Sequence, residues 1–270
     1  MAVAIAIAAL VLFSIAFQLL TPWWLTPLAS NWKSIDTALH ITLWVCGIFF
    51  IILNLFLAFS IYRYRHRRGH RAHYDPESVT LERRLTVWTA IGIAALLAPG
   101  LIAWKEFVTV PKDALVFEAV GQQWQWTFRF PGKDGVLGTV SSRQVSPDNP
   151  FGLNPDDPYG RDDILVEGNE VHLPLGRPVK VVLRSKDVLH DFFVPQIRAK
   201  MDLVPGMVTY FWFTPTRAGK YEILCAELCG VSHYTMRGAM VIDQEPAFDA
   251  WLSQQPTYAQ LKAEAAQSTG

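Results

Sequence analysis

Three long apolar stretches in the first 104 residues constrain what this chain can fold into, because each is long enough to cross a lipid bilayer. They cover residues 2–20, residues 40–62 and about residues 85–104. Five arginines lie within residues 63–71, between the second and third stretches, and arginine-rich loops beside spans mark the cytoplasmic side. The second and third stretches are therefore predicted to form a transmembrane hairpin, with everything after Trp104 outside the cytoplasm.

The first and third stretches each leave a structural question open. Residues 2–20 carry no charge, which favours a retained membrane helix or anchor. A cleaved secretory signal is the alternative, although a basic start is missing and no clean small-residue cleavage site lies near Ala29-Ser30. In the third stretch, Pro99-Gly100 predicts a kink or a break near the far end.

After about residue 110 the pattern changes to short strand-like runs separated by turn residues, which indicates a β-sandwich. Residues 141–163, rich in Pro, Asp, Asn and Gly, are expected to form a long surface insertion, either a solvated loop or, through its acids, a calcium site. A short helix is expected over 248–254 and a frayed polar tail over 262–270. The predicted strands are 115–120, 124–130, 164–166, 179–183, 208–213, 221–224 and 238–242. The predicted divisions are an apolar segment 1–30, a membrane hairpin 31–109, a β domain 110–246 and a short helix with a flexible tail 247–270.

A cluster of soft metal-binding side chains lies near the end of the β domain. Cys225, Cys229, His233 and Met236 follow one another at Cys-x3-Cys-x3-His-x2-Met spacing, and His190 follows the apolar run 179–183. Thiolates, imidazole and thioether together suit copper, and two thiolates on one loop can bridge two copper ions. A disulfide would leave the imidazole and thioether unexplained, and zinc rarely takes methionine.

The pattern Cys-x-Glu-x-Cys-Gly-x-x-His-x-x-Met, with an upstream Val-Leu-His and Val-Pro, resembles subunit II of the haem–copper cytochrome c oxidases, over about residues 35–255. That family carries a binuclear copper centre called CuA. The resemblance implies a cupredoxin-like sandwich after the membrane helices. It also implies electron entry from cytochrome c and transfer to haem in the catalytic subunit I, where oxygen is reduced to water and protons are translocated.

The expected setting of the chain is the inner membrane of a bacterium, with the copper domain in the periplasm. Subunit I, subunit III, cytochrome c and membrane lipid are the implied partners. No nucleic acid is expected, because the basic run 63–71 is explained by membrane topology.

The resemblance also assigns the metal ligands. The side chain of Glu227 would reach a magnesium ion shared with the catalytic subunit, since magnesium prefers oxygen ligands. The copper ligands would be Cys225 and Cys229 as bridges, His190 and Met236 on one copper, and His233 with the backbone carbonyl of Glu227 on the other.

Two further residues receive roles from the resemblance. Trp124, in Gly-Gln-Gln-Trp-Gln-Trp, matches the residue through which electrons are thought to enter, whereas the residues alone favour a buried strand tryptophan. Glu82 matches a glutamate at a proton entrance under one alignment. Under another alignment Leu85 takes that place, and Glu82 is a solvated charge beside two arginines.

Charges near the copper motif bear on the donor. Asp187 and Asp191 are candidates for donor docking, but Arg129 and Lys186 stand where relatives often have acids. The sequence therefore predicts either a less basic donor or a docking surface that depends more on apolar contact.

Three other functions can be weighed on the residues, of which the first stays open and the other two are disfavoured. A CuA-containing subunit of a nitric oxide reductase would keep the copper site and change the reaction. A quinol oxidase subunit II would lack the copper ligands, and a periplasmic copper carrier would not need a membrane hairpin. The chain contains no Cys-x-x-Cys-His haem-attachment motif, so the electron donor must be a separate molecule or subunit.

Overall fold

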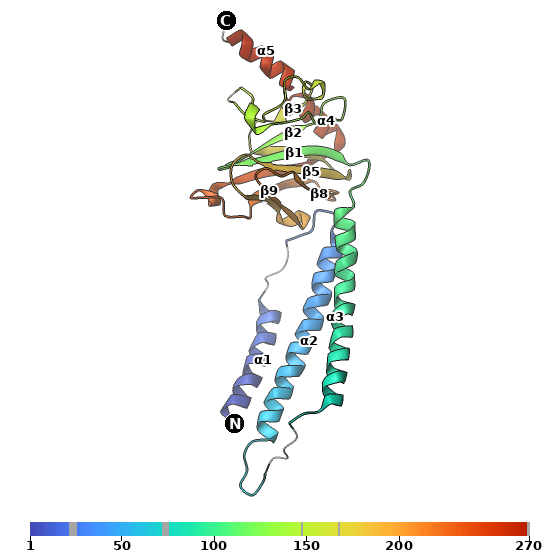
Figure 1. Ribbon diagram of the computed structural model, residues 1–270, viewed down its shortest axis with the longest axis vertical. Coiled ribbons are helices and arrows are strands. Elements are labelled where there is room, and N and C mark those ends of the chain that lie inside the picture. The colour runs from blue at the N-terminus through green and yellow to red at the C-terminus, as the bar shows by residue number, and fades with distance from the viewer. Residues whose placement is uncertain (22–25, 72–75, 147, 167, 269–270) are drawn as a thin grey trace. The chain divides into compact units, whose positions relative to one another are not determined.

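The computed structural model describes residues 1–21, 26–71, 76–146, 148–166 and 168–268 (Figure 1). The chain divides into two compact units. The first is helical and comprises Met1–Leu25 and Ser34–Lys105, and the second comprises Thr26–Lys33 and Glu106–Gly270.

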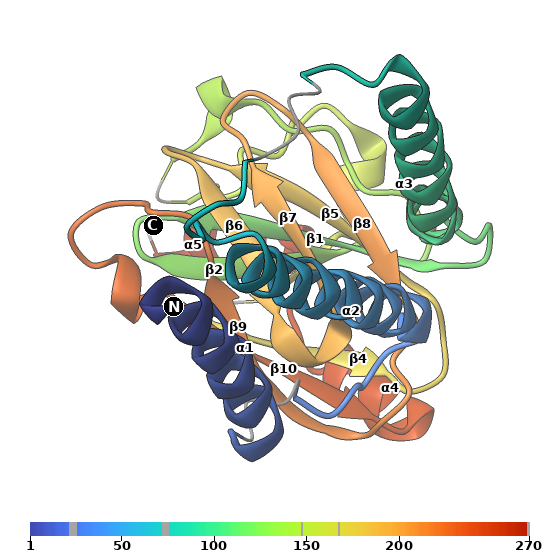
Figure 2. The same cartoon turned by 90° about the horizontal axis from the view of Figure 1, so that it is seen from below.

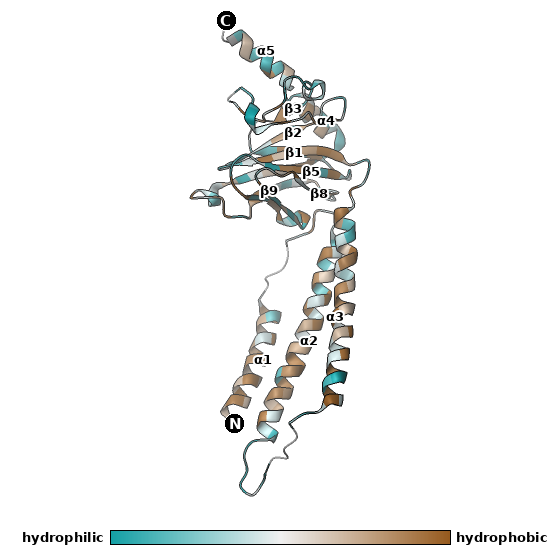
Figure 3. Ribbon diagram, in the orientation of Figure 1, coloured by the Kyte–Doolittle hydropathy of each residue, from teal (hydrophilic) through white to brown (hydrophobic). Residues whose placement is uncertain are grey.

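The helical unit confirms the three expected apolar helices. They are α1 (Ala2–Leu20), α2 (Lys33–Arg63) and α3 (Val79–Val108), and each is long and apolar enough to cross a membrane. Figure 3 shows apolar residues along most of their length. Most of their large apolar side chains are exposed in the isolated chain, which leaves these surfaces available to lipid or to other membrane helices. Of the kink or break expected at Pro99-Gly100, the break is absent, because α3 continues through these residues.

The second unit contains ten strands in two five-stranded sheets, seen from another side in Figure 2. The first sheet has the order β3-β2-β1-β5-β8 and the second has the order β4-β10-β9-β6-β7. Most neighbours are antiparallel, but β1 pairs with β5 and β4 with β10 in parallel. The strands are β1 (Leu115–Gln122), β2 (Gln125–Phe130), β3 (Ile164–Val166), β4 (Glu170–Pro174), β5 (Val179–Ser185), β6 (His190–Val194), β7 (Ala199–Leu203), β8 (Thr209–Phe213), β9 (Gly219–Cys225) and β10 (Arg237–Asp243).

The two sheets pack face to face, which confirms the predicted sandwich. Trp126 of the first sheet meets Phe192 of the second edge-on at 5.4 Å between ring centroids, and Phe192 lies 5.9 Å from Phe211. All three aromatic side chains are fully buried. Burial of each such side chain contributes roughly 1.5–3 kcal/mol, so this aromatic contact is a main source of stability next to the metal ligands.

Three strands were not predicted from the sequence. β4 and β7 have only five residues each, and His172, Lys200 and other polar residues interrupt their buried side chains. Neither strand therefore forms an apolar run that stands out in the sequence. β6 reads His-Asp-Phe-Phe-Val, which lacks clean alternation because four of its five residues are buried.

The insertion between β2 and β3 lies at the surface, as expected, but part of it packs on the first sheet. Phe151 and Leu153 are buried against Val120, Leu165 and Tyr258 in a small second core. Burial of this apolar surface attaches the insertion to the sheet at Phe151 and Leu153.

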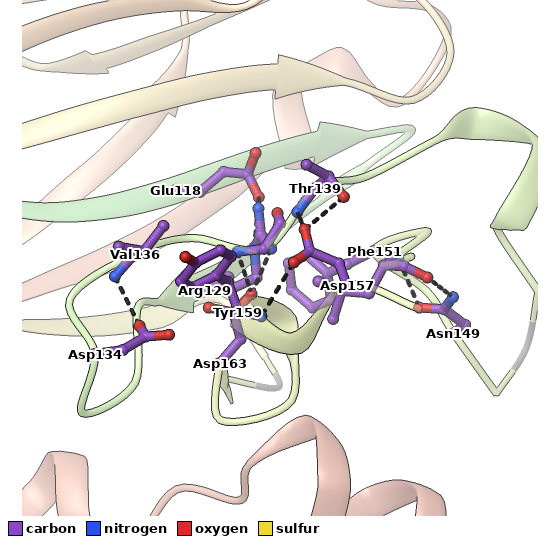
Figure 4. Close-up of polar contacts among 12 residues, drawn as sticks. Glu118, Arg129, Asp134, Val136, Thr139, Asn149, Phe151, Asp157, Tyr159 and Asp163 are labelled. Atoms are coloured by element: carbon purple, nitrogen blue, oxygen red, sulfur yellow. Dashed lines mark hydrogen bonds and ion pairs between the residues drawn. The ribbon is translucent and has the colours of Figure 1, made fainter. Parts of the chain in front are cut away.

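The acids of the insertion bind backbone groups of the same segment. Asp157 accepts hydrogen bonds from the backbone and hydroxyl of Thr139 and from the backbone of Tyr159. Asp134 accepts one from the backbone of Val136 (Figure 4). Among the described residues, these carboxylates form no group of metal-binding side chains, so nothing supports the calcium alternative.

A buried ion network joins this insertion to the first sheet. Arg129 forms ion pairs with Glu118 at 2.8 Å and with Asp163 at 2.6 Å, and Arg184 also binds Glu118. Burial alone would raise the pKa of Glu118, but the two arginines hold it below its ordinary value. Burial raises the pKa of Asp163 to about 6 despite Arg129. Arg129 is only 2% exposed, so its expected place on the docking surface is wrong.

The C-terminal region forms two helices, α4 (Glu245–Ser253) and α5 (Tyr258–Ser268). The predicted short helix is confirmed as α4. The expected frayed tail is wrong for residues 262–268, because Tyr258 and Leu261 anchor the start of α5 in the small second core. Residues 269–270 of the predicted tail lie outside the described part of the chain.

Residues 26–33, which precede and begin α2, belong to the β unit. The backbone of Ala29 bonds with Gln196 and Thr216, and the Ser30 hydroxyl donates to the carbonyl of Ile197. Trp32 is buried and donates its indole N–H to the carbonyl of Trp212. The predicted boundary at residue 30 therefore falls inside a segment that is built into the edge of the sandwich.

Candidate metal centre

The metal-ligand loop connects two neighbouring strands of the second sheet. Cys225 is the last residue of β9, a short 3-10 turn starts at His233, and Met236 directly precedes β10. The backbone N–H of Cys225 donates to the carbonyl of Met236, which closes the loop at its base. His190 begins β6, and the register that places Phe192 opposite Cys225 brings this imidazole beside the loop.

The structure brings the six predicted copper ligands together. The shortest separations between their donor atoms lie between 3.2 and 3.9 Å. These are Cys225 Sγ to Cys229 Sγ at 3.7 Å, Cys225 Sγ to His190 Nδ1 at 3.9 Å, Cys225 Sγ to the Glu227 carbonyl at 3.2 Å, Cys229 Sγ to His233 Nδ1 at 3.5 Å, and Cys229 Sγ to Met236 Sδ at 3.8 Å.

The donor set fits copper. Both imidazoles present Nδ1 to a cysteine sulfur, and a thioether and a carbonyl oxygen lie at the two sides of the sulfur pair. The sulfurs are unbonded at 3.7 Å, well beyond the roughly 2.05 Å of a disulfide. Such a soft, mixed sulfur and nitrogen set is what copper prefers.

The two thiols differ in acidity. For Cys225, burial opposes ionisation, but hydrogen bonds from His190 and neighbouring backbone groups outweigh it and lower its pKa to about 7. For Cys229, burial and the adjacent Cys225 sulfur raise its pKa to about 12. The first thiolate therefore forms readily near neutral pH, and the second becomes accessible when a cation compensates the charge.

A carboxylate orients the buried imidazole. Asp187 Oδ1 lies 2.8 Å from His190 Nε2, and Asp187 Oδ2 accepts a hydrogen bond from the backbone N–H of Gln123. This contact leaves Nδ1 of the fully buried His190 free to act as the metal ligand. Asp187 is thus a ligand-orienting residue as well as a partly exposed acid.

The two acids predicted for donor docking lie in different environments. Asp187 has a side chain that is 31% exposed. Asp191 is 1% exposed and pairs with Lys200, because its side chain points into the domain from β6. The prediction that Asp191 contacts the donor is therefore wrong. Lys186 is half-buried and donates to Gln122, so its charge is partly satisfied within the domain.

Trp124 lies in the turn between β1 and β2 and packs against the metal-ligand loop. A Cβ atom placed on Gly230 would meet Trp124 Cζ2 at 3.3 Å and its Nε1 at 3.4 Å. Gly230 directly follows Cys229, and its φ of 126° favours glycine. The half-buried indole therefore packs against the residue that directly follows a predicted bridging cysteine.

Of the remaining predicted site residues, Glu227 reaches the sulfur pair only through its backbone and Glu82 belongs to the helical unit. The carbonyl of Glu227 faces Cys225, while its side chain is partly exposed. Glu82 lies in the first turn of α3, in the helical unit, and its side chain is exposed.

Sequence reasoning missed Gln123 and Gly121. Gln123 donates its side-chain amide to the Cys229 carbonyl at 2.8 Å, a contact between residues 106 positions apart. A Cβ on Gly121 would lie 3.1 Å from the ring of His190. The Gly-Gln-Gln-Trp stretch gave a signal only for its tryptophan.

Replacing Gly121 with alanine is expected to displace His190 and weaken copper binding. The added methyl group would press on the imidazole and on Leu203, both at 3.1 Å, in a fully packed region. Overpacking of this kind costs about 1–3 kcal/mol, so copper retention during dialysis should fall roughly tenfold or more. Copper analysis of the full chain measures this, and a variant that retains copper like the wild type would contradict the proposed contact.

Comparisons with known proteins place these features in a family. A family model described as "Cytochrome C oxidase subunit II, periplasmic domain" matches residues 115–244. The alternative cytochrome c oxidase subunit 2 of Bradyrhizobium diazoefficiens is 54% identical over 261 residues, covering 97% of this chain and 94% of that protein. Cytochrome c oxidase subunit 2 of Cereibacter sphaeroides is 27% identical over 216 residues, covering 76% and 70%.

A solved structure gives a weaker match. The periplasmic domain of subunit II of cytochrome oxidase from Bradyrhizobium japonicum is 26% identical, with a TM-score of 0.40, and the match covers 54% of this chain and 95% of that chain.

Proposed function

Because this chain belongs to the cytochrome c oxidase subunit 2 family and is part of a haem–copper oxidase complex, we propose that it is the electron-entry subunit. It accepts single electrons from cytochrome c at a binuclear copper centre and passes them to haem in the catalytic subunit I. The pair of cysteine sulfurs 3.7 Å apart, each with an imidazole Nδ1 within 3.9 Å, carries this proposal.

The proposed ligand assignment is the one that the family resemblance implies. Cys225 and Cys229 are shared by both coppers, and the other four donors lie around the sulfur pair. When bound, the copper pair supplies a reversible one-electron centre. The assignment places His190 and Met236 on one copper, and His233 with the Glu227 carbonyl on the other.

The protein limits movement around this centre. Trp126 packs against the ring of His190 at 6.4 Å, Phe192 packs against Trp126, and Asp187 fixes the imidazole through Nε2. His190, Cys229 and Met236 are at most 2% exposed. A buried, hydrogen-bonded ligand set of this kind excludes water and keeps its geometry when the charge changes.

Trp124 is proposed as the point of electron entry, because it is half-buried against Gly230, next to Cys229. Replacing Trp124 with phenylalanine is expected to slow copper reduction by cytochrome c at least roughly tenfold, the scale of losing a contact that aligns donor and acceptor. The copper content should stay unchanged. Rapid mixing of reduced cytochrome c with the assembled oxidase measures the rate.

A matched control for this experiment is the replacement of Trp251 with phenylalanine. Trp251 lies on α4, where it stacks on His172 at 4.5 Å, and it is not in contact with the copper ligands. Equal rates for the two tryptophan variants would contradict electron entry at Trp124.

The wider setting is also proposed. We propose that the chain lies in the inner membrane of a bacterium, with the β unit in the periplasm, beside subunits I and III; three helices that are long and apolar enough to span a membrane support this setting. The partly exposed Asp187 is proposed as the acidic contact for cytochrome c. The Glu227 side chain is proposed to hold a magnesium ion shared with subunit I. Glu82 is proposed to lie at a proton entrance at the cytoplasmic end of α3.

The proposed final electron acceptor is oxygen. We therefore expect the purified complex to turn over with oxygen and not with nitric oxide.

A further inference from the structure

Gln123 connects the turn that carries Trp124 to two parts of the metal centre, His190 and Cys229. The backbone N–H of Gln123 donates to Asp187 Oδ2 at 2.7 Å, and Asp187 Oδ1 contacts His190. The side-chain amide of the same Gln123 donates to the carbonyl of Cys229 at 2.8 Å. One residue thus reaches the histidine side through a carboxylate and the cysteine side directly.

From these two contacts we propose that Gln123 is a positioning residue that holds the electron-entry turn in register with the bridging Cys229. This inference rests on the proposed electron-entry function. It concerns how the chain sets the distance between Trp124 and the sulfur pair, and it assigns no metal ligand.

The packing at Gly230 supports this role independently of the hydrogen bonds. A Cβ atom on Gly230 would lie 2.9 Å from Gln123 Nε2 and 3.3 Å from Trp124 Cζ2. The backbone after Cys229 therefore touches both residues of the turn at close range. A glycine here permits this approach and also adopts the φ of 126° that the loop needs.

The hydrogen-bond donor on Gln123 is what the proposal requires, and three substitutions separate it from size and charge. Gln123→Ala removes the amide, Gln123→Glu keeps the size but replaces the donor with an acceptor, and Gln123→Lys supplies a donor of another shape. Each keeps the backbone N–H that binds Asp187. Gln125→Ala, an exposed glutamine two residues further on, is the matched control.

The experiment measures copper reduction by reduced cytochrome c in the assembled oxidase, together with the copper hyperfine pattern in electron paramagnetic resonance. Loss of one hydrogen bond to the Cys229 carbonyl is expected to slow reduction at saturating donor about fivefold in the Ala and Glu variants. Their hyperfine patterns should change, and the KM for cytochrome c should stay within about twofold. The Lys variant should recover part of the rate, and Gln125→Ala should match the wild type.

Several results would overturn the proposal. Wild-type rates and spectra in the Ala and Glu variants would do so, and so would a Glu variant that behaves like the wild type while the Ala variant does not. A change confined to KM would make Gln123 a docking contact. If every Gln123 variant, including Lys, lost copper, Gln123 would be needed for the folding of the site and not for positioning the turn through its hydrogen bond. A wild-type complex without copper-based electron uptake would instead refute the proposed function itself.

Discussion

Replacing Cys229 with serine is expected to abolish copper binding and to reduce cytochrome c oxidation by more than about 100-fold, because no bridging thiolate remains at this position. A serine hydroxyl stays protonated near neutral pH and is a hard oxygen donor. Cys229 Sγ lies within 3.8 Å of Cys225, His233 and Met236, so its removal affects both proposed coppers. Copper analysis and oxygen consumption of the purified complex measure the effect.

Cys46 provides the matched control for this prediction. It is the third cysteine of the chain and lies on α2 in the helical unit. Cys46→Ser should leave the copper content and the oxidase rate unchanged. Retention of two coppers in the Cys229 variant would contradict the bridging role.

Replacing Arg129 with methionine is expected to destabilise the β unit by about 3–5 kcal/mol, because two buried carboxylates lose their main cation. Arg129 contacts Glu118, Asp163 and the carbonyl of Gly138 and is 2% exposed. Methionine keeps much of the volume of the arginine side chain, so the loss of stability reports mainly the loss of the positive charge. Denaturant unfolding of the full chain, followed by tryptophan fluorescence, gives the free energy of unfolding.

An exposed ion pair in the same unit supplies the comparison. Arg237 pairs with Glu222 at 2.7 Å, but the two side chains are 62% and 49% exposed. Arg237→Met should therefore cost less than about 1 kcal/mol. Adding Asp163→Asn to the Arg129 variant should restore part of the stability, because one unpaired buried charge is removed. Equal losses for Arg129→Met and Arg237→Met would contradict the buried network.

The helices and the metal-ligand loop could be predicted because their signals are local in sequence. An apolar stretch such as residues 40–62 spans a bilayer whatever its tertiary contacts, and four soft donors between Cys225 and Met236 share one loop. His190 lies on another strand. It entered the prediction as the second imidazole that a copper pair needs, after the apolar run 179–183, and the pairing of β6 with β9 places it beside Cys225.

The features that sequence reasoning missed depend on contacts between distant segments. Arg129 was assigned to a docking surface because relatives often have acids at its position, but its side chain is buried against Gly138 and Asp163 of the insertion. Asp191 was likewise assigned to the surface, yet Phe192 and its neighbours on β6 are buried on both sides. Gln123 acts on residues 64 and 106 positions away, so no local pattern marks it.

The most direct test of the central claim is copper analysis of the purified full chain together with its electron paramagnetic resonance spectrum. We expect two coppers per chain and one unpaired electron shared between two copper nuclei, because the two sulfurs would bridge both ions. One copper with an unshared electron, or no copper with a Cys225–Cys229 disulfide, would contradict a binuclear electron-entry site.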